Sequence, residues 1–211
     1  MTDAAAIVLA TSEALGRPRD LPLAAALPAP MELAIVVADD DSLEAALPVL
    51  IEALAPLGIA CTHLEVVLCC DAGGAPRRQA RERLRAALGP TRVHAHDAGR
   101  GDPYVAARLD EMPVRLDDAL RESEGVVLVL AMRPGATGAG LAGEAIAALA
   151  DAETRARLGE RTRALIDALP IDLALVIETG PSPRAWAGTG RWLLAERFPP
   201  AGAGRMEGRT S

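Results

Sequence analysis

Five short segments of the chain are rich in Val, Ile and Leu, and their apolar positions are nearly continuous rather than alternating with polar ones. Such runs are typical of strands covered on both faces, as in a parallel sheet flanked by helices. We therefore predict strands at Leu33–Ala38, Leu64–Cys70, Arg92–His96, Val126–Ala131 and Leu173–Glu178.

The segments between these strands carry helical spacing. Asp41 and Glu44 form a start that resembles a capping box, and leucine and isoleucine residues then recur every three or four positions until Gly58. Pro48 lies inside this pattern. Because proline lacks the N–H of a helical residue, it predicts a kink or a late start of the helix.

Two further helices are predicted downstream. One begins near Pro76 and ends at Gly89, and a long one runs from about Gly143 to Leu169, with Gly159 as the point at which it would break. Strands that alternate with helices at this spacing form βαβ units. The sequence thus predicts a three-layer α/β domain with a mostly parallel, Rossmann-like sheet, helices on both faces and a binding site at the carboxyl ends of the strands.

The two ends of the chain differ from its middle in composition. Residues 1–30 are rich in Ala, Pro and Leu and are predicted to form an N-terminal arm packed on the domain. The α/β domain itself is predicted to occupy residues 31–198, with Thr179–Gly190 as a hairpin-like turn. Residues 199–211 are predicted to be a disordered tail.

Composition excludes several kinds of chemistry. All 22 basic residues are arginine, so a Schiff base, a Walker-type phosphate lysine and a lysine-tethered cofactor are not available within these 211 residues. A net charge of −7 and few aromatic residues disfavour nucleic-acid binding. No apolar run approaches the roughly 20 residues that span a bilayer, so no membrane association is expected. Three cysteines, two of them adjacent, do not form a disulfide framework, so a cytoplasmic location is expected.

A glycine string, Gly138, Gly140 and Gly143, has the spacing GxGxxG between a strand and a helix. Three interpretations stay open. It is a dinucleotide fingerprint, a general anion-binding loop whose charge Arg133 would supplement, or a turn in which glycine permits close packing. The first glycine stands seven residues after the strand, and no acidic residue ends a second strand about 20 residues later, as the dinucleotide motif requires.

Other polar groups gather at the predicted strand ends. His94 and His96 share a strand face near the level of Cys69 and Cys70, which allows either a His/Cys metal cluster or buried cysteines that serve as small core residues. The triplet Asp39–Asp41 allows either a divalent cation site or a helix cap.

An arginine stripe follows the Pro76 position. Arg77, Arg81 and Arg85 share one helix face, which allows either attraction of an anion or a solvated surface. No GxSxG elbow or other serine-histidine-aspartate arrangement is recognisable.

Taken in order, several segments resemble a known family. They are Ser12–Asp40, Cys69–Gly74, Val93–Ala98, Val126–Ala131 and Ala139–Glu144. Over about residues 10–190, their sequence is similar to the N-terminal domain of the nickel-pincer lactate racemase family and its 2-hydroxyacid racemase and epimerase relatives. The resemblance implies a nickel-carrying pyridinium mononucleotide bound between two domains, hydride transfer between substrate and cofactor, and two histidines as acid and base.

The functional residues of that family are largely replaced here. Asp39 matches the first aspartate of the family motif after strand one, but Ser42 stands in place of the phosphate-binding arginine. Ala75 and Ala136 occupy the positions of histidines, and Ile146 stands near the position of the cofactor-bearing lysine. Losing an imidazole acid or base typically lowers a rate by about 10² to 10⁴.

We therefore predict a lactate-racemase-like domain that has lost racemase catalysis and acts as a binding or assembly module, without a cofactor. Its partner would be a small anionic ligand or a protein, and an apolar strand-end face would favour a homo-oligomer. The rival hypothesis is a divergent 2-hydroxyacid racemase or epimerase, or a nucleotide-binding enzyme. His96 and Asp97 match a family segment without a catalytic role. The predicted binding residues are Asp39, Asp41, Gly73, Gly74, His96, Asp97, Arg133, Gly138, Gly140 and Gly143.

Overall fold

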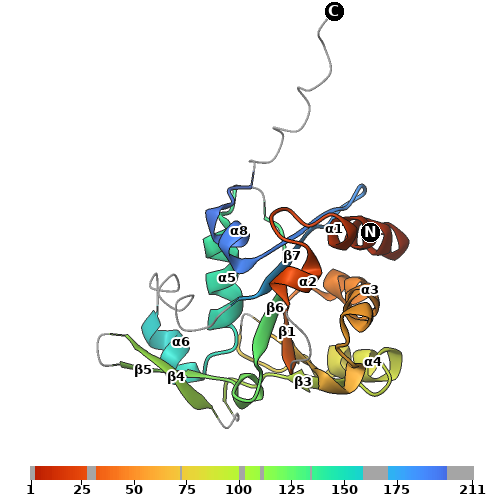
Figure 1. Ribbon diagram of the computed structural model, residues 1–211. Helices are drawn as coiled ribbons and strands as arrows, with labels where there is room; N and C mark the ends of the chain where they lie inside the picture. The colour runs from red at the N-terminus through yellow and green to blue at the C-terminus, as the bar shows by residue number, and fades with distance from the viewer. Residues whose placement is uncertain are drawn as a thin grey trace, which may run out of the picture.

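A six-stranded sheet forms the centre of the molecule (Figure 1). The computed structural model describes residues 3–27, 32–71, 73–99, 103–109, 112–133, 135–158 and 171–198. All five predicted strands are confirmed, and they run parallel to one another. A sixth strand pairs antiparallel with the last of them. The strands are β1 (Leu33–Val37), β2 (Leu64–Leu68), β3 (Arg92–Ala95), β6 (Gly125–Ala131), β7 (Leu173–Glu178) and β8 (Arg184–Gly188), in the order β3-β2-β1-β6-β7-β8.

Strand β1 lies between β2 and β6 and fixes where a ligand can bind. Ile35 is opposite Val66 of β2 and Val127 of β6, and every residue of β1 is buried. The chain proceeds from β1 to β2 and β3 on one side and continues to β6 and β7 on the other. The order of strands therefore reverses at β1, and in open α/β sheets the crevice at such a switch point is where ligands bind.

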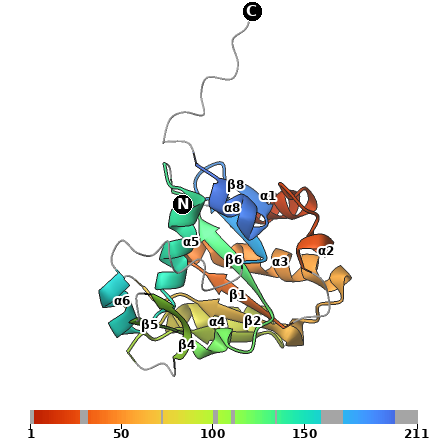
Figure 2. The same cartoon turned by 60° about the vertical axis from the view of Figure 1, so that its left-hand side comes forward.

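The sheet separates two apolar cores, because successive side chains of a strand point to opposite faces. Leu33, Ile35 and Val37 pack into one core, and Ala34 and Val36 pack into the other. Figure 2 shows β1 and β6 between α3 on one side and α5 on the other. The three-layer α/β prediction is confirmed.

The first core is covered by helices from the N-terminal half of the chain. Within residues 1–30, the described part contains a helix whose Ile7, Ala14 and Leu15 are buried against the sheet. The elements are α1 (Ala4–Gly16), α2 (Leu23–Ala26), the 3₁₀ helices η1 (Asp41–Ala46), η2 (Ala55–Leu57) and η3 (Cys61–His63), and the helices α3 (Leu47–Leu54) and α4 (Arg78–Ala87).

The second core is covered by elements from the C-terminal half, together with a β-hairpin that the sequence pattern did not predict. In that hairpin, β4 pairs antiparallel with β5 outside the central sheet. The elements are β4 (Tyr104–Leu109), β5 (Met112–Leu116), η4 (Asp118–Leu120), α5 (Gly138–Ala147), α6 (Ala152–Leu158) and α8 (Gly190–Ala195).

The helix predicted after β1 begins in two stages. Asp40, not Asp41, is the cap, because its carboxylate accepts a hydrogen bond from the N–H of Ser42 at 2.9 Å. The chain then forms a 3₁₀ helix and becomes α-helical only at Leu47, next to Pro48. The late start is therefore confirmed, since proline fits the first turn of a helix where its missing N–H has no role.

The long helix predicted from Gly143 to Leu169 is wrong as a single element. Helix α5 begins five residues earlier, at Gly138, and the chain leaves the helix before α6 begins at Ala152. Asp151 starts α6 by accepting a hydrogen bond from the N–H of Thr154 at 2.7 Å. An aspartate that caps a new helix interrupts the old one. Gly159 lies outside the described residues.

The segment predicted as a hairpin-like turn, Thr179–Gly190, contains a complete strand. Strand β8 pairs with β7 from Ala174 opposite Gly188 to Glu178 opposite Arg184, so only the residues between the two strands form the turn. The predicted disordered tail, residues 199–211, lies outside the described residues.

Candidate functional site

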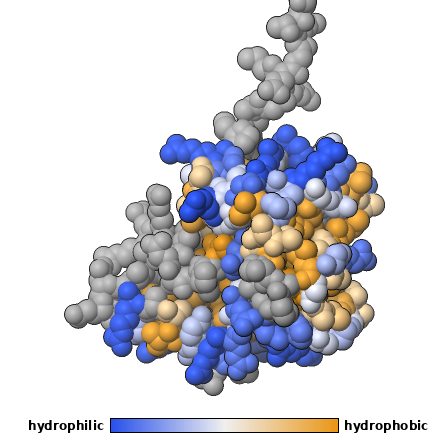
Figure 3. Space-filling model, viewed as in Figure 1, coloured by the Kyte–Doolittle hydropathy of each residue, from blue (hydrophilic) through white to orange (hydrophobic). Residues whose placement is uncertain are grey.

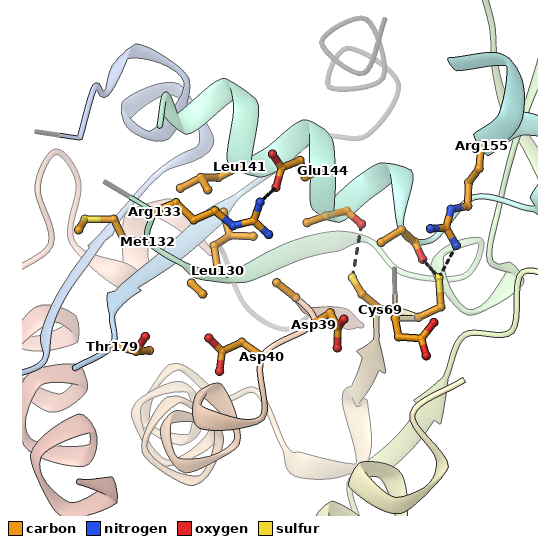
Figure 4. Close-up of a pocket in the computed structure, with 16 residues that line it drawn as sticks. Asp39, Asp40, Cys69, Leu130, Met132, Arg133, Leu141, Glu144, Arg155 and Thr179 are labelled. Atoms are coloured by element: carbon orange, nitrogen blue, oxygen red, sulfur yellow. Dashed lines mark hydrogen bonds and ion pairs between the residues drawn. The ribbon is translucent and has the colours of Figure 1, made fainter. Parts of the chain in front are cut away.

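A cavity of about 420 Å³ lies at the carboxyl ends of β1, β2, β6 and β7, beside α5 (Figure 4). We call it the strand-end cavity. It occupies the switch point at which the parallel topology places ligands. Its lining residues are Ala38, Asp39, Asp40, Cys69, Cys70, Asp71, Leu130, Ala131, Met132, Arg133, Leu141, Glu144, Ala145, Ala148, Arg155 and Thr179.

One side of the cavity is acidic, because Asp39 and Asp40 directly follow β1. A carboxylate oxygen of Asp39 lies 3.4 Å from Nε of Arg77, whose side chain is only 7% exposed. Arg77 also donates a hydrogen bond to the carbonyl of Ala38 at 3.0 Å. This nearly buried guanidinium therefore holds the acidic side in place from behind.

Asp41 lies beside the cavity rather than in it. It forms an ion pair with Arg77 and another with Arg83 at 3.1 Å. Hydrogen bonding from Arg77 lowers the pKa of Asp41. Of the two interpretations of the aspartate triplet, the helix cap is observed at Asp40, while Arg77 pairs with the other two members, Asp39 and Asp41.

The arginine stripe predicted from the sequence divides in the structure. Arg77 is nearly buried in the contacts just described, whereas Arg81 forms an ion pair with its neighbour Glu82 at 2.6 Å and with no other described residue. Arg83, which sequence reasoning did not single out, joins Asp41 and also Glu44 at 2.6 Å. Arg77 is therefore the member of the stripe that contacts residues of the strand-end cavity, Ala38 and Asp39.

The opposite side of the cavity carries an exposed ion pair. Arg133, which follows β6, lies 2.9 Å from the carboxylate of Glu144 on α5. The two side chains are 69% and 55% exposed. Ion pairs this exposed contribute about 0–1 kcal/mol, so little free energy is needed to exchange Glu144 for the carboxylate of a ligand.

Two adjacent thiols form the wall nearest α5. Cys69 donates a hydrogen bond to the carbonyl of Ala145 at 3.4 Å, and Cys70 donates to Ala148 at 2.9 Å. Arg155 donates to the sulfur of Cys70 at 2.9 Å. Burial raises the pKa of both thiols. They are therefore neutral hydrogen-bond donors at neutral pH and poor nucleophiles.

The two histidines of the β3 segment bind a residue that sequence reasoning missed. Nε2 of His94 and Nδ1 of His96 lie 2.9 and 2.6 Å from the same carboxylate oxygen of Asp117, and Nε2 of His96 donates to the carbonyl of Ala150 at 3.1 Å. We call these three residues the His–Asp–His cluster. His96 and Asp117 are almost fully buried, whereas His94 is 43% exposed.

Charge within the His–Asp–His cluster is strongly stabilised. Although burial opposes it, hydrogen bonds from His94 and His96 hold the pKa of Asp117 well below its usual range. The hydrogen bond to Asp117 likewise raises the pKa of His94. The proposed His/Cys metal cluster does not form, because the thiols bind carbonyls of α5 while the imidazoles bind Asp117. Among the described residues, no three His, Cys, Asp or Glu side chains are arranged to hold a metal ion.

The glycine string forms the first turns of α5 rather than a loop. Its amides are used within the protein, since Gly138 donates to the carbonyl of Glu196 at 3.0 Å and Gly140 donates to Oγ1 of Thr137 at 3.0 Å. A Cβ atom added to Gly138 would lie 1.8 Å from the carbonyl oxygen of Leu193. Of the three interpretations, the structure supports close packing, here between α5 and α8.

The remaining predicted site residues line a second hollow beside the strand-end cavity. Gly73, Gly74 and Asp97 border it together with Arg155, which lines both spaces. Gly74 has a φ of +85°, a left-handed conformation that favours glycine in this tight turn.

The predicted binding residues are thus only partly brought together. Asp39 and Arg133 line the strand-end cavity. Asp41, His96, Gly138, Gly140 and Gly143 do not belong to its lining. Sequence reasoning missed Glu144 and Arg155, whose positions on α5 and α6 depend on how those helices end and begin.

Apolar side chains exposed at the surface lie away from the cavity. Figure 3 shows apolar surface beside α1, α2 and α3, among charged residues. The large exposed apolar residues of the described ranges are Val8, Leu9, Leu21, Val105 and Leu194, none of which lines the cavity. The expectation of an apolar strand-end face is therefore not met there.

Comparisons with known proteins give a similar fold and no family. No family model matches the chain, and no curated protein matches it. Among solved structures, the lactate racemase apoprotein from Thermoanaerobacterium thermosaccharolyticum aligns with 87% of this chain at a TM-score of 0.56 and 13% identity. The alignment covers 52% of that protein, so this chain spans about half its length. In the described ranges, none of the helices has the length and apolar character required to cross a membrane.

Proposed function

We propose that this chain is a lactate-racemase-like domain that binds a small carboxylate ligand in the strand-end cavity and has lost nickel-pincer racemase catalysis. The observation that carries the proposal is the cavity itself, at the switch point of the sheet, with the exposed Arg133 on its wall and no imidazole or amine among the described residues that line it. The similar fold of the lactate racemase apoprotein supports the relationship.

The residues present do not fit the nickel cofactor of the racemase family. Ile146 of α5, near the position of the family's tethering lysine, is buried in the second apolar core. The sequence contains no lysine that could take over the tethering role. Imidazole is a good ligand for nickel, and a cysteine binds a metal ion only as its thiolate. Here the imidazoles of His94 and His96 bind Asp117, and burial raises the pKa of the Cys69 and Cys70 thiols. We therefore assign no step to this cofactor.

Binding would proceed by exchange of ion pairs. A ligand carboxylate takes the place of Glu144 on Arg133, whose planar guanidinium can hold both carboxylate oxygens. The apolar side of the ligand then meets Leu130, Met132 and Leu141, which line the same space. A wall that combines aliphatic side chains with placed charged groups suits a small molecule that has an apolar and a charged part, and about 420 Å³ lies within the usual range of small-molecule sites.

Assembly with a protein partner has weaker support than binding of a small molecule. The exposed apolar residues are dispersed over α1, α8, the hairpin and Leu21 rather than gathered around the cavity. Interfaces that hold proteins together bury a continuous patch with an apolar centre.

Calorimetric titration with short aliphatic carboxylates, combined with a chiral assay of 2-hydroxyacids, tests the proposal. We expect binding without racemisation, and an Arg133→Gln variant that binds at least about tenfold more weakly, because a hydrogen bond to a charged group is lost. Arg121→Gln is the matched control, since Arg121 is an exposed arginine paired with Asp118 outside the cavity lining.

Two results would contradict this proposal. Racemisation of lactate or another 2-hydroxyacid by the purified chain would restore the rival hypothesis of a divergent enzyme. Equal affinity of the wild type and the Arg133→Gln variant would place the carboxylate elsewhere.

A further inference from the structure

The charges of the strand-end cavity do not suit a ligand that is only an anion. Its lining includes four carboxylates, Asp39, Asp40, Asp71 and Glu144, but two guanidiniums, Arg133 and Arg155. An excess of one sign in a partly enclosed space disfavours ligands of the same sign. A carboxylate ligand therefore needs a second group that offsets this excess.

Asp40 is the carboxylate best placed to receive that group. One of its oxygens accepts hydrogen bonds from the N–H and hydroxyl of Ser42. Within the part of the chain that the structure describes, Asp40 forms no ion pair, whereas Asp39 has Arg77 and Glu144 has Arg133. Asp71 forms no ion pair there either, but it follows β2, whereas Asp40 follows β1, the strand directly beside β6 and Arg133. Asp40 is therefore the carboxylate without an ion pair that stands next to the strand end of Arg133.

Asp40 and Arg133 lie on different walls of the same space. Figure 4 shows Asp40 on the β1 side, near Thr179, and Arg133 on the α5 side, with Leu130 between the two walls. A molecule that bridges them must carry a positive and a negative group, joined by a part that contacts aliphatic side chains.

We infer that the ligand is a small aliphatic zwitterion of the α-amino acid type, with its ammonium on Asp40 and its carboxylate on Arg133. This inference rests on the proposed function, since it concerns the same cavity and the same carboxylate contact. An ammonium donates hydrogen bonds and also carries charge, whereas the hydroxyl of a 2-hydroxyacid offers one neutral hydrogen bond.

Three ligands that share an isobutyl group separate the contribution of the ammonium from that of the carboxylate. Leucine carries both charges, 2-hydroxy-4-methylpentanoate carries the carboxylate alone, and 3-methylbutylamine carries the ammonium alone. By calorimetric titration of both enantiomers where they exist, we expect leucine to bind at least about tenfold more tightly than either analogue, because charge-assisted hydrogen bonds are roughly twice as strong as neutral ones. N-acetyl-leucine, whose nitrogen is uncharged, should lose the same advantage.

The protein side is tested with Asp40→Asn. Asparagine caps helices about as well as aspartate, so the fold should persist while the charge is removed. We expect leucine and the hydroxyacid to bind this variant about equally. Asp3→Asn is the matched control, because Asp3 also caps a helix through its carboxylate but does not line the cavity, and it should keep the preference for leucine.

The outcomes separate the zwitterion inference from the proposed carboxylate site. If the hydroxyacid binds as tightly as leucine, or if Asp40→Asn keeps the preference for leucine, the zwitterion inference is overturned while the carboxylate site stands. If no carboxylate ligand binds, or if the Arg133→Gln variant binds carboxylates as tightly as the wild type, the proposed function itself is wrong.

Discussion

The strand-end cavity and the His–Asp–His cluster differ in how far their polar side chains are exposed to solvent and how many protein partners these side chains have. In the cluster, His96 and Asp117 are 1% and 4% exposed, and each ring nitrogen of His96 has a protein partner. In the cavity, Arg133 and Glu144 are more than half exposed and share only one ion pair. The buried His96 is thus fully engaged by the protein, and the partly exposed His94 binds it through one ring nitrogen, while Arg133 and Glu144 stay accessible to solvent.

The comparison predicts different costs for removing a carboxylate from each region. Asp117 and Asp40 both cap a 3₁₀ helix by accepting from the N–H two residues later, so alanine removes a cap at either position. Asp117→Ala also leaves two imidazoles without their buried partner and should lower the free energy of unfolding by about 3–5 kcal/mol. Asp40→Ala should cost about 1 kcal/mol, the usual value of a cap.

Urea unfolding of the two variants at neutral pH measures this difference. Equal destabilisation by both substitutions would mean that the histidines gain nothing from Asp117 beyond its cap, and the contrast between the two regions would disappear.

A smaller effect is expected in the pH dependence of stability. The pKa of His94 is raised above its ordinary value of 6.5, so its contribution is fully present below pH 6.5 and is lost as pH rises through the raised pKa. The pKa of Asp117 is lowered, so its contribution is present above pH 3.8 and is lost as pH falls toward the lowered pKa. The cluster should therefore stabilise the fold most between these two values.

Urea midpoints from pH 5.5 to 9 test the histidine part of this expectation. The wild type should lose stability across that range, and His94→Asn should show a shallower slope. His63→Asn serves as the control, because His63 lies outside the cluster, and it should keep the slope of the wild type. A slope of the same size in His94→Asn would remove His94 as its source.

The smallest effect concerns the thiols of the cavity wall. The thiols of Cys69 and Cys70 are buried and donate hydrogen bonds to carbonyls of α5, and burial raises their pKa. Cys61 is partly exposed. With a chromogenic disulfide reagent at pH 8, we expect about one thiol per folded chain to react quickly and all three to react after unfolding.

Cys61→Ser should remove the fast phase of that reaction. A fast phase that persists in this variant would indicate that α5 opens away from the strand ends, and the cavity wall would then be less closed than the His–Asp–His cluster.

The parallel strands could be predicted because strands that are buried on both faces consist almost entirely of apolar residues. β1 and β6 are continuous runs of aliphatic residues, which only a doubly covered strand tolerates. β8 was not predicted because its segment, Arg184–Gly188, lacks a continuous aliphatic run. It combines arginine and tryptophan with small residues, as is common in an edge strand. The break between α5 and α6 was not predicted, because the apolar residues on both sides of Asp151 keep a helical spacing. Asp151 nevertheless starts a new helix by capping α6.

The candidate site was predictable only where its residues follow strands. Asp39 and Arg133 stand directly after predicted strands, so topology alone brought them to one edge. Asp117 lies 21 and 23 residues from the two histidines that it binds, and Arg155 lies 85 residues from Cys70. No local pattern marks contacts of this range, because they arise from the packing of the hairpin and α6 against the sheet.

Because the cations of the cavity wall, Arg133 and Arg155, are guanidiniums rather than amines, they present planar arrays of N–H donors. A guanidinium does not condense with a carbonyl compound as a lysine amine does. A ketone or aldehyde group of a guest molecule would therefore be left unmodified by these two side chains, which offer it only hydrogen bonds.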